Sequence, residues 1–139
     1  MMTDNTDASI SIALPVEDRP RSSAFYRAFL DREPPGEPQE DGEPEPLQFH
    51  LTASTILMLI PRGGFGWVSG DDEEFSQGSV EVLLSRVAAD EDEVRSWTRA
   101  AATAGGRVIV EPARQEWGFT AVVADPDGHR WQIVTDSQL

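Results

Sequence analysis

Apolar and polar side chains alternate strictly along residues 9–16, SISIALPV, near the start of the chain. Ile10, Ile12, Leu14 and Val16 share one face of an extended chain, and this two-residue period is typical of a half-buried strand. The run TILMLI at 55–60 is apolar on both faces, which indicates a strand buried on both sides. Further strands are predicted at 47–52, 79–85, 107–112, 117–124 and 130–135.

Helical spacing of apolar residues occurs in two places. The stretch DRPRSSAFYRAFL begins with a capping aspartate and a first-turn proline, and it predicts a helix over 19–30. Asp90 and Glu93 have the spacing of a capping box, and a helix over 91–104 follows from it. Gly105-Gly106 would end this second helix.

Two stretches break the periodicity. Residues 31–46 contain five prolines and seven acidic residues, so we predict a long mobile loop or a poorly paired edge segment without packing. Residues 63–77 are rich in glycine and are interpreted as a linker that carries Phe65 and Trp67. The chain therefore divides into two segments of the same order.

Each segment predicts a βαβββ module, one over 9–62 and one over 78–136. A module of this size leaves an apolar sheet face exposed, so two modules are expected to pair. The predicted fold class is α+β: a single domain over 1–139 in which the two modules form a cup-shaped mixed sheet backed by helices.

Composition excludes several functions. The chain has no cysteine, which removes thiolate nucleophiles, disulfide scaffolds and zinc fingers. Three acidic runs, 31–46, 71–74 and 90–93, account for the whole net charge of −14. The rest is neutral and offers no basic stripe for nucleic acid. We find no signal peptide and no apolar run long enough for a membrane span, and we expect a cytoplasmic protein without membrane partners.

Four short segments carry a resemblance to a known family: LPVEDRPRSSAFY at 14–26, EVLLS at 81–85, ATAGG at 102–106 and DPDGHRWQI at 125–133. Together they resemble the vicinal oxygen chelate superfamily, which includes glyoxalases, bleomycin resistance proteins and extradiol dioxygenases. The resemblance covers roughly residues 9–136. It does not define an activity, because the superfamily includes metal-dependent lyases, isomerases and dioxygenases as well as metal-free drug-binding proteins.

The resemblance also locates the positions at which metal-dependent members carry His or Glu ligands. A one-residue slip at the second position would choose Leu57 or Leu59, which have no donor atom. One carboxylate with a hydroxyl, a thioether and an amide is a poor site for Zn, Ni, Fe or Mn, so neither a metal nor another cofactor is expected. The four positions are Ser11, Met58, Glu81 and Gln132.

Glu81 is the candidate catalytic residue, since burial in an apolar cup would raise its pKa and suit it to general acid or base chemistry. It could equally bind a cationic ligand or form a structural ion pair. Trp67 and Trp117 lie near strand ends, where they would stack on a planar or cationic ligand or pack in a dimer interface. His50 occupies the polar face of its strand, and the pattern leaves open whether that face meets the cup or water.

These residues favour a metal-independent small-molecule-binding protein similar to the drug-binding branch of the superfamily. The expected ligand is aromatic or cationic and is held by Ser11, Met58, Glu81, Gln132, Trp67, Trp117 and His50; the expected assembly is a homodimer. The alternatives are a glyoxalase-type lyase, isomerase or dioxygenase with a degenerate metal site, a metal-independent enzyme that uses Glu81, and a non-catalytic interaction domain.

Overall fold

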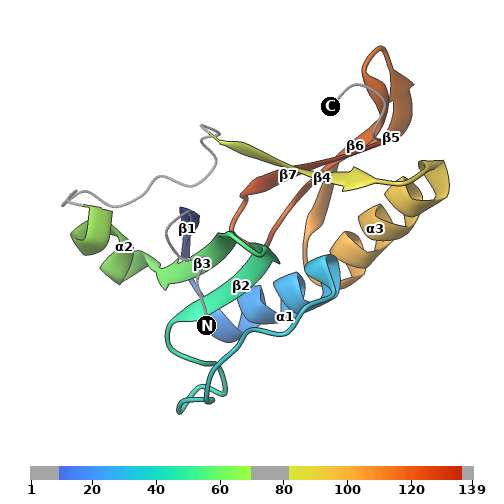
Figure 1. The fold of residues 1–139 in the computed structure, drawn as a ribbon. Coiled ribbons are helices and arrows are strands. Elements are labelled where there is room, and N and C mark those ends of the chain that lie inside the picture. The colour runs from blue at the N-terminus through green and yellow to red at the C-terminus, as the bar shows by residue number, and fades with distance from the viewer. Residues whose placement is uncertain (1–9, 70–81, 136–139) are drawn as a thin grey trace. The chain divides into compact units, whose positions relative to one another are not determined.

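The computed structural model describes residues 10–69 and 82–135, with only the backbone described at 67–69. The chain divides into two compact units, Met1–Phe75 and Ser76–Leu139. Each unit holds one sheet with a helix packed against it, which confirms the α+β class (Figure 1). No helix among the described residues is long and apolar enough to cross a membrane.

The first unit contains a three-stranded sheet in the order β1-β3-β2. Strand β3 is central, pairing parallel with β1 and antiparallel with β2. The elements are β1 (Ile10–Val16), α1 (Arg19–Leu30), β2 (Leu47–Thr52), β3 (Thr55–Pro61) and α2 (Arg62–Ser69).

Helix α1 covers one face of this sheet. The Asp18 side chain accepts a hydrogen bond from the backbone N–H of Arg21 at 3.0 Å, which caps the helix as the sequence predicts. Tyr26 packs on Phe49 of β2, with ring centroids 5.9 Å apart. The core between helix and sheet is closed by fully or nearly fully buried side chains: Leu14, Val16, Phe25, Phe29, Leu30, Leu47, Leu57 and Leu59.

The second unit contains a four-stranded sheet in the order β4-β7-β6-β5. Helix α3 packs across one face of it, burying Val94 and Ala101. The predicted capping box is present: Asp90 accepts from the Glu93 N–H at 2.9 Å, and the Glu93 carboxylate accepts from the Ala89 N–H at 2.8 Å. The elements are β4 (Leu83–Ala88), α3 (Glu91–Thr103), β5 (Arg107–Gln115), β6 (Gly118–Ala124) and β7 (Arg130–Thr135).

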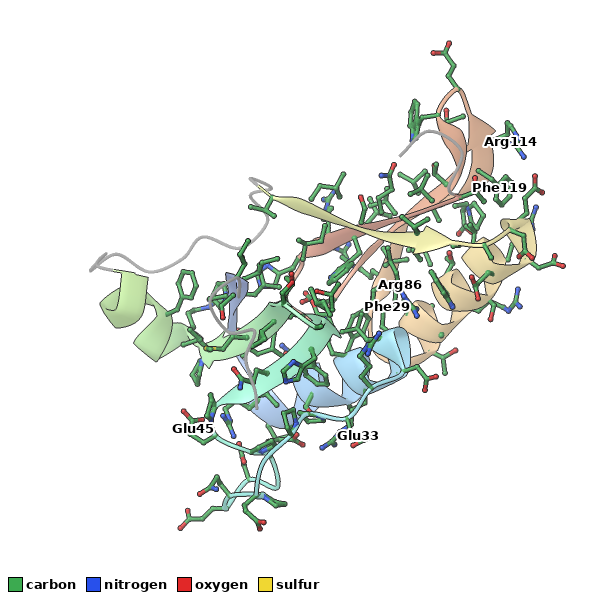
Figure 2. All side chains as sticks on the ribbon, viewed as in Figure 1. Phe29, Glu33, Glu45, Arg86, Arg114 and Phe119 are labelled. Carbon is green, nitrogen blue, oxygen red and sulfur yellow. The ribbon has the colours of Figure 1, made fainter. Side chains whose placement is uncertain are left out.

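An arginine covers the aromatic residue of α3. The Arg86 guanidinium carbon lies 3.4 Å from the ring centroid of Trp97, close enough for a cation–π interaction. Arg86 therefore projects toward α3, and the alternate residues of β4 project to the opposite face of the sheet. Figure 2 labels Arg86, together with Arg114 and Phe119, whose guanidinium carbon and ring centroid are 5.8 Å apart.

The structure differs from the expected segment order in the first unit and from the expected strand bounds in the second. The described part of the first unit contains two strands after α1, at the two positions that the sequence predicts, where a βαβββ module would have three. Helix α2 begins at residue 62 and extends into the stretch 63–77 that is interpreted as a linker, and it packs against β1 and β3. Its three glycines have low helix propensity, which is why the pattern failed to predict it. Strand β4 runs on to Ala88, while residues 79–81 lie outside the described part of the chain.

Residues 31–46, which we call the acidic strap, pack along α1. The expectation of a loop without packing is therefore wrong. Pro34 and Pro44 are buried, and the Glu43 side chain is only 7% exposed. Figure 2 labels Glu33 and Glu45 on the strap.

A row of three residues on α1 holds the strap. Arg19, Ser23 and Arg27 are spaced i, i+4, i+8 and so share one side of the helix. Arg19 pairs with Asp41 at 2.8 Å and with Glu45, and it donates to the Pro44 carbonyl at 2.8 Å. The Ser23 hydroxyl donates to the Glu43 carboxylate at 2.5 Å. Arg27 completes the row through ion pairs with Glu33 at 3.0 Å and Glu43 at 3.3 Å.

Candidate functional site

Three of the predicted site residues share one face of the first sheet. Strand register aligns Ser11 with Ile56 and Ile56 with His50, while Met58 lies between Ala13 and Gln48. Paired residues of neighbouring strands project to the same side, so Ser11, His50 and Met58 all occupy the face opposite α1. Ser11 and His50 are exposed and Met58 is half-buried. His50 thus shares the face of the predicted ligand-binding residues.

The second sheet has a corresponding face opposite α3, which we call the open face. Strand register places Ser85 of β4 beside Gln132 of β7, and Gln132 beside Val122 of β6. The neighbours of Gln132 along β7, Trp131 and Ile133, are buried on the α3 side. Gln132 therefore projects to the open face, as alternation along the strand predicts.

A hydrogen-bond relay joins three side chains on the open face. The indole Nε1–H of Trp117 donates to Gln132 Oε1 at 3.0 Å. Gln132 Nε2 in turn donates to Ser85 Oγ at 3.2 Å. The predicted residues Trp117 and Gln132 are thus in direct contact, and Ser85 joins them from β4.

Apolar side chains surround the relay. Leu83 and Val87 precede and follow Ser85 by two residues on β4, and are 52% and 44% exposed. Val110 of β5 pairs with Val122 and is 42% exposed, and Trp117 itself is 50% exposed. Exposed apolar groups gathered around fixed polar groups are typical of a ligand-binding surface.

A glycine fixes the turn that carries Trp117. Gly118 has a φ of +143°, and a Cβ there would lie 2.9 Å from Thr135 Oγ1 and 3.2 Å from the Thr135 carbonyl oxygen. The same Oγ1 accepts a hydrogen bond from the Phe119 N–H at 3.0 Å. Only glycine fits this contact without displacement, so the close approach of β6 to the end of β7 positions the indole beside Gln132.

The donor atoms present do not fit a transition metal. Ser11 and Met58 supply a hydroxyl and a thioether, and the Gln132 amide is engaged by Trp117 and Ser85. Zn, Ni, Fe and Mn prefer imidazole and carboxylate ligands. Within residues 10–69 and 82–135, no group of three or more His, Asp or Glu side chains stands close enough to hold a metal ion.

Two predicted site residues are not placed. Glu81 lies outside the described residues, and Trp67 is described only as part of the α2 backbone. Ser85 is the residue that sequence reasoning missed. The sequence does contain a signal for Ser85. It follows Glu81 by four residues, which is twice the two-residue period of a strand, so the two residues belong to the same face of an extended chain.

Comparison with known proteins agrees with the fold. The sequence-family model of the Glyoxalase/Bleomycin resistance protein/Dioxygenase superfamily matches residues 10–133. No protein of curated function matches the chain. A hypothetical protein, SA1046 from S. aureus, is 25% identical with a TM-score of 0.77, over 91% of this chain and 92% of that one.

Two further solved structures have the same fold at lower identity. A glyoxalase-related enzyme from Fulvimarina pelagi is 22% identical, with a TM-score of 0.78 over 97% of this chain and 89% of that one. A lactoylglutathione lyase from Agrobacterium tumefaciens is 18% identical, with a TM-score of 0.64 over 96% of each chain. The chain belongs to the Glyoxalase/Bleomycin resistance protein/Dioxygenase superfamily.

Proposed function

We propose that the protein binds a small molecule, without a metal ion, on the open face of the second sheet. The observation that supports this most directly is the relay of Trp117, Gln132 and Ser85 among exposed apolar side chains. Hydrogen bonds hold the three polar groups in fixed positions, which lowers the entropy cost of binding a ligand to them. The apolar surroundings supply the driving force.

The proposed ligand has an aromatic or apolar body. The half-exposed indole of Trp117 offers a ring face for stacking, and Leu83, Val87 and Val110 offer aliphatic contacts. A cationic ligand group is proposed separately, on Glu81 alone. If that carboxylate contacts a cation, Glu81→Gln should weaken binding by about 1.5–3 kcal/mol, the scale of a charge-assisted hydrogen bond.

We exclude metal chemistry from the proposed function because of the donor atoms that these residues supply. A hydroxyl, a thioether and an amide already engaged by an indole N–H do not make a tight site for a transition metal. The alternative is a lyase, isomerase or dioxygenase of glyoxalase type, which superfamily membership alone keeps open. Metal content separates the two functions.

A thermal-unfolding screen of small aromatic compounds tests the proposal. A compound that binds only the native state raises the melting temperature. We expect such compounds to lose their effect in Trp117→Ala and to keep it in Ser96→Ala, which changes an exposed residue of α3 on the opposite side of the sheet. Equal shifts in both variants would place the ligand elsewhere.

We also propose that the protein is a homodimer. Strands β4 and β5 are the two edges of the second sheet, and exposed edges favour pairing with another chain. Light scattering at micromolar concentration should give twice the mass of one chain. A monomer under these conditions would refute the dimer.

A further inference from the structure

The chemistry of the Trp117 indole fixes the orientation of the Gln132 amide. An indole Nε1–H can only donate, so the Gln132 atom that faces it at 3.0 Å must be the amide oxygen. The amide nitrogen then lies on the other side, 3.2 Å from Ser85 Oγ. An assignment that is often ambiguous for a glutamine side chain is here determined by its neighbour.

The relay therefore runs in one direction and ends on a serine hydroxyl. The lone pair of the amide nitrogen is delocalised into the carbonyl group and does not accept, so Ser85 Oγ must accept from this nitrogen. This leaves the Ser85 O–H free to donate, because within the described part of the chain no hydrogen bond from this hydroxyl is formed. The second N–H of Gln132 is likewise unused there. Two donor hydrogens thus remain at the end of the relay.

These donors lie between apolar side chains. Ser85 is exposed, and Leu83 and Val87 flank it on the same face of β4. An apolar ligand that covered both donors would remove the water bound to them. Such a ligand would bind poorly unless it supplied an acceptor in place of that water. In folded proteins a buried donor is rarely left without a partner, whereas a buried acceptor more often keeps one lone pair unused. The two donors therefore decide which ligand group fits.

We propose that the ligand is a flat, apolar molecule carrying an uncharged acceptor oxygen of carbonyl type, which accepts the Ser85 O–H. This rests on the proposed function, because it assumes that a ligand lies on the open face. A ligand ammonium would bring further donors to a position that already has two. A cationic group, if the ligand has one, therefore lies away from Ser85.

A matched pair of probes tests the inference on the full-length protein. Acetylnaphthalene and ethylnaphthalene have similar shape and differ chiefly in the carbonyl oxygen. Their affinities are measured from the indole N–H resonance of Trp117, identified by its loss in Trp117→Phe. We expect acetylnaphthalene to bind about three- to tenfold more tightly, the range of one neutral hydrogen bond. Ser85→Ala should abolish this difference, and Ser96→Ala on α3 should preserve it.

The outcomes distinguish an error in the proposed ligand class from an error in the proposed binding site. Equal affinities of the two probes for the wild-type protein would overturn the acceptor inference and leave the binding function intact. The inference would also be wrong if (naphthylmethyl)ammonium bound most tightly and lost its affinity in Glu81→Gln but not in Ser85→Ala. If none of the three probes bound at millimolar concentration, both the inference and the proposed site on the open face would be wrong.

Discussion

Arg19 and Asp41 lie 22 positions apart in the sequence, and their side chains meet with Nε and Oδ2 2.8 Å apart. Arg19 opens α1, and Asp41 belongs to the acidic strap. Most of the arginine side chain is covered, with 12% exposed, whereas that of Asp41 is 35% exposed. The pair closes one end of a contact that extends along α1 through Ser23 and Arg27.

The first prediction concerns acid. The hydrogen bond from Arg19 lowers the pKa of Asp41 below its ordinary value of 3.8. Because the folded-state pKa is the lower one, the pair stabilises the fold fully above about pH 4 to 5 and loses this effect as the pH falls through the lowered pKa. Asp41→Asn should therefore be less stable than the wild type at neutral pH, and the difference should vanish in strong acid. Urea unfolding across this pH range measures it.

Glu40→Gln is the control for that series. Glu40 lies next to Asp41 on the strap and is exposed, so its substitution removes the same charge without removing the Arg19 partner. Its stability should follow that of the wild type at every pH. A difference between Asp41→Asn and the wild type that stayed constant down to strong acid would contradict the assigned role of the pair.

The second prediction concerns the buried carboxylate of the strap. Glu43 accepts from Ser23 and pairs with Arg27. Removing it in Glu43→Ala takes the carboxylate acceptor from the buried Ser23 hydroxyl and leaves Arg27 paired with Glu33 alone, which should lower the free energy of unfolding by about 1–3 kcal/mol. Glu37→Ala, at an exposed position of the strap, should change it by less than about 0.5 kcal/mol. Equal effects in the two variants would mean that the strap does not stabilise the first unit.

A third prediction uses two glycines that both have a positive φ. Gly118 and Gly105 have φ values of +143° and +104°, but a Cβ would meet Thr135 at Gly118 and open space at Gly105. Alanine strains the backbone at both positions, by about 1–3 kcal/mol, and adds a steric contact only at Gly118. Gly118→Ala should therefore be the less stable variant and should shift the Trp117 indole resonance. The prediction fails if Gly105→Ala shifts that resonance as much.

The fourth prediction concerns metal content. The purified protein should retain no stoichiometric Zn, Ni, Fe or Mn after mild chelation, since the donors at Ser11, Met58 and Gln132 are a hydroxyl, a thioether and an amide. Elemental analysis measures this directly. A tightly retained metal would make a glyoxalase-type enzyme the leading function.

Most of the fold could be predicted because strand periodicity and helix caps are local signals. Helix α1 has the predicted bounds, and α3 begins where Asp90 and Glu93 indicate. The packing of the acidic strap could not be inferred from its composition, because its stability depends on partners in α1. The i, i+4, i+8 spacing of Arg19, Ser23 and Arg27 was the available signal. Helix α2 was missed because its glycines disfavour a helix that packing against β1 and β3 supports.

The candidate site could be predicted in part. Alternation placed Gln132 on the face opposite the helix, and this is confirmed by the burial of Trp131 and Ile133. Contact between Trp117 and Gln132 depends on the turn at Gly118 and on strand register, which a single sequence does not define. The proposed ligand-binding roles of all seven residues remain predictions: Ser11, Met58, Glu81, Gln132, Trp67, Trp117 and His50.

The most direct test of ligand binding on the open face is an NMR titration with any compound that raises the melting temperature. The Trp117 indole and the Gln132 side-chain amide report from this face, and the Trp97 indole, which packs against Arg86 on the α3 side, is an internal control. We predict that the resonances of Trp117 and Gln132 move together with one dissociation constant while that of Trp97 stays in place. Binding that left Trp117 and Gln132 unmoved would contradict the proposed site.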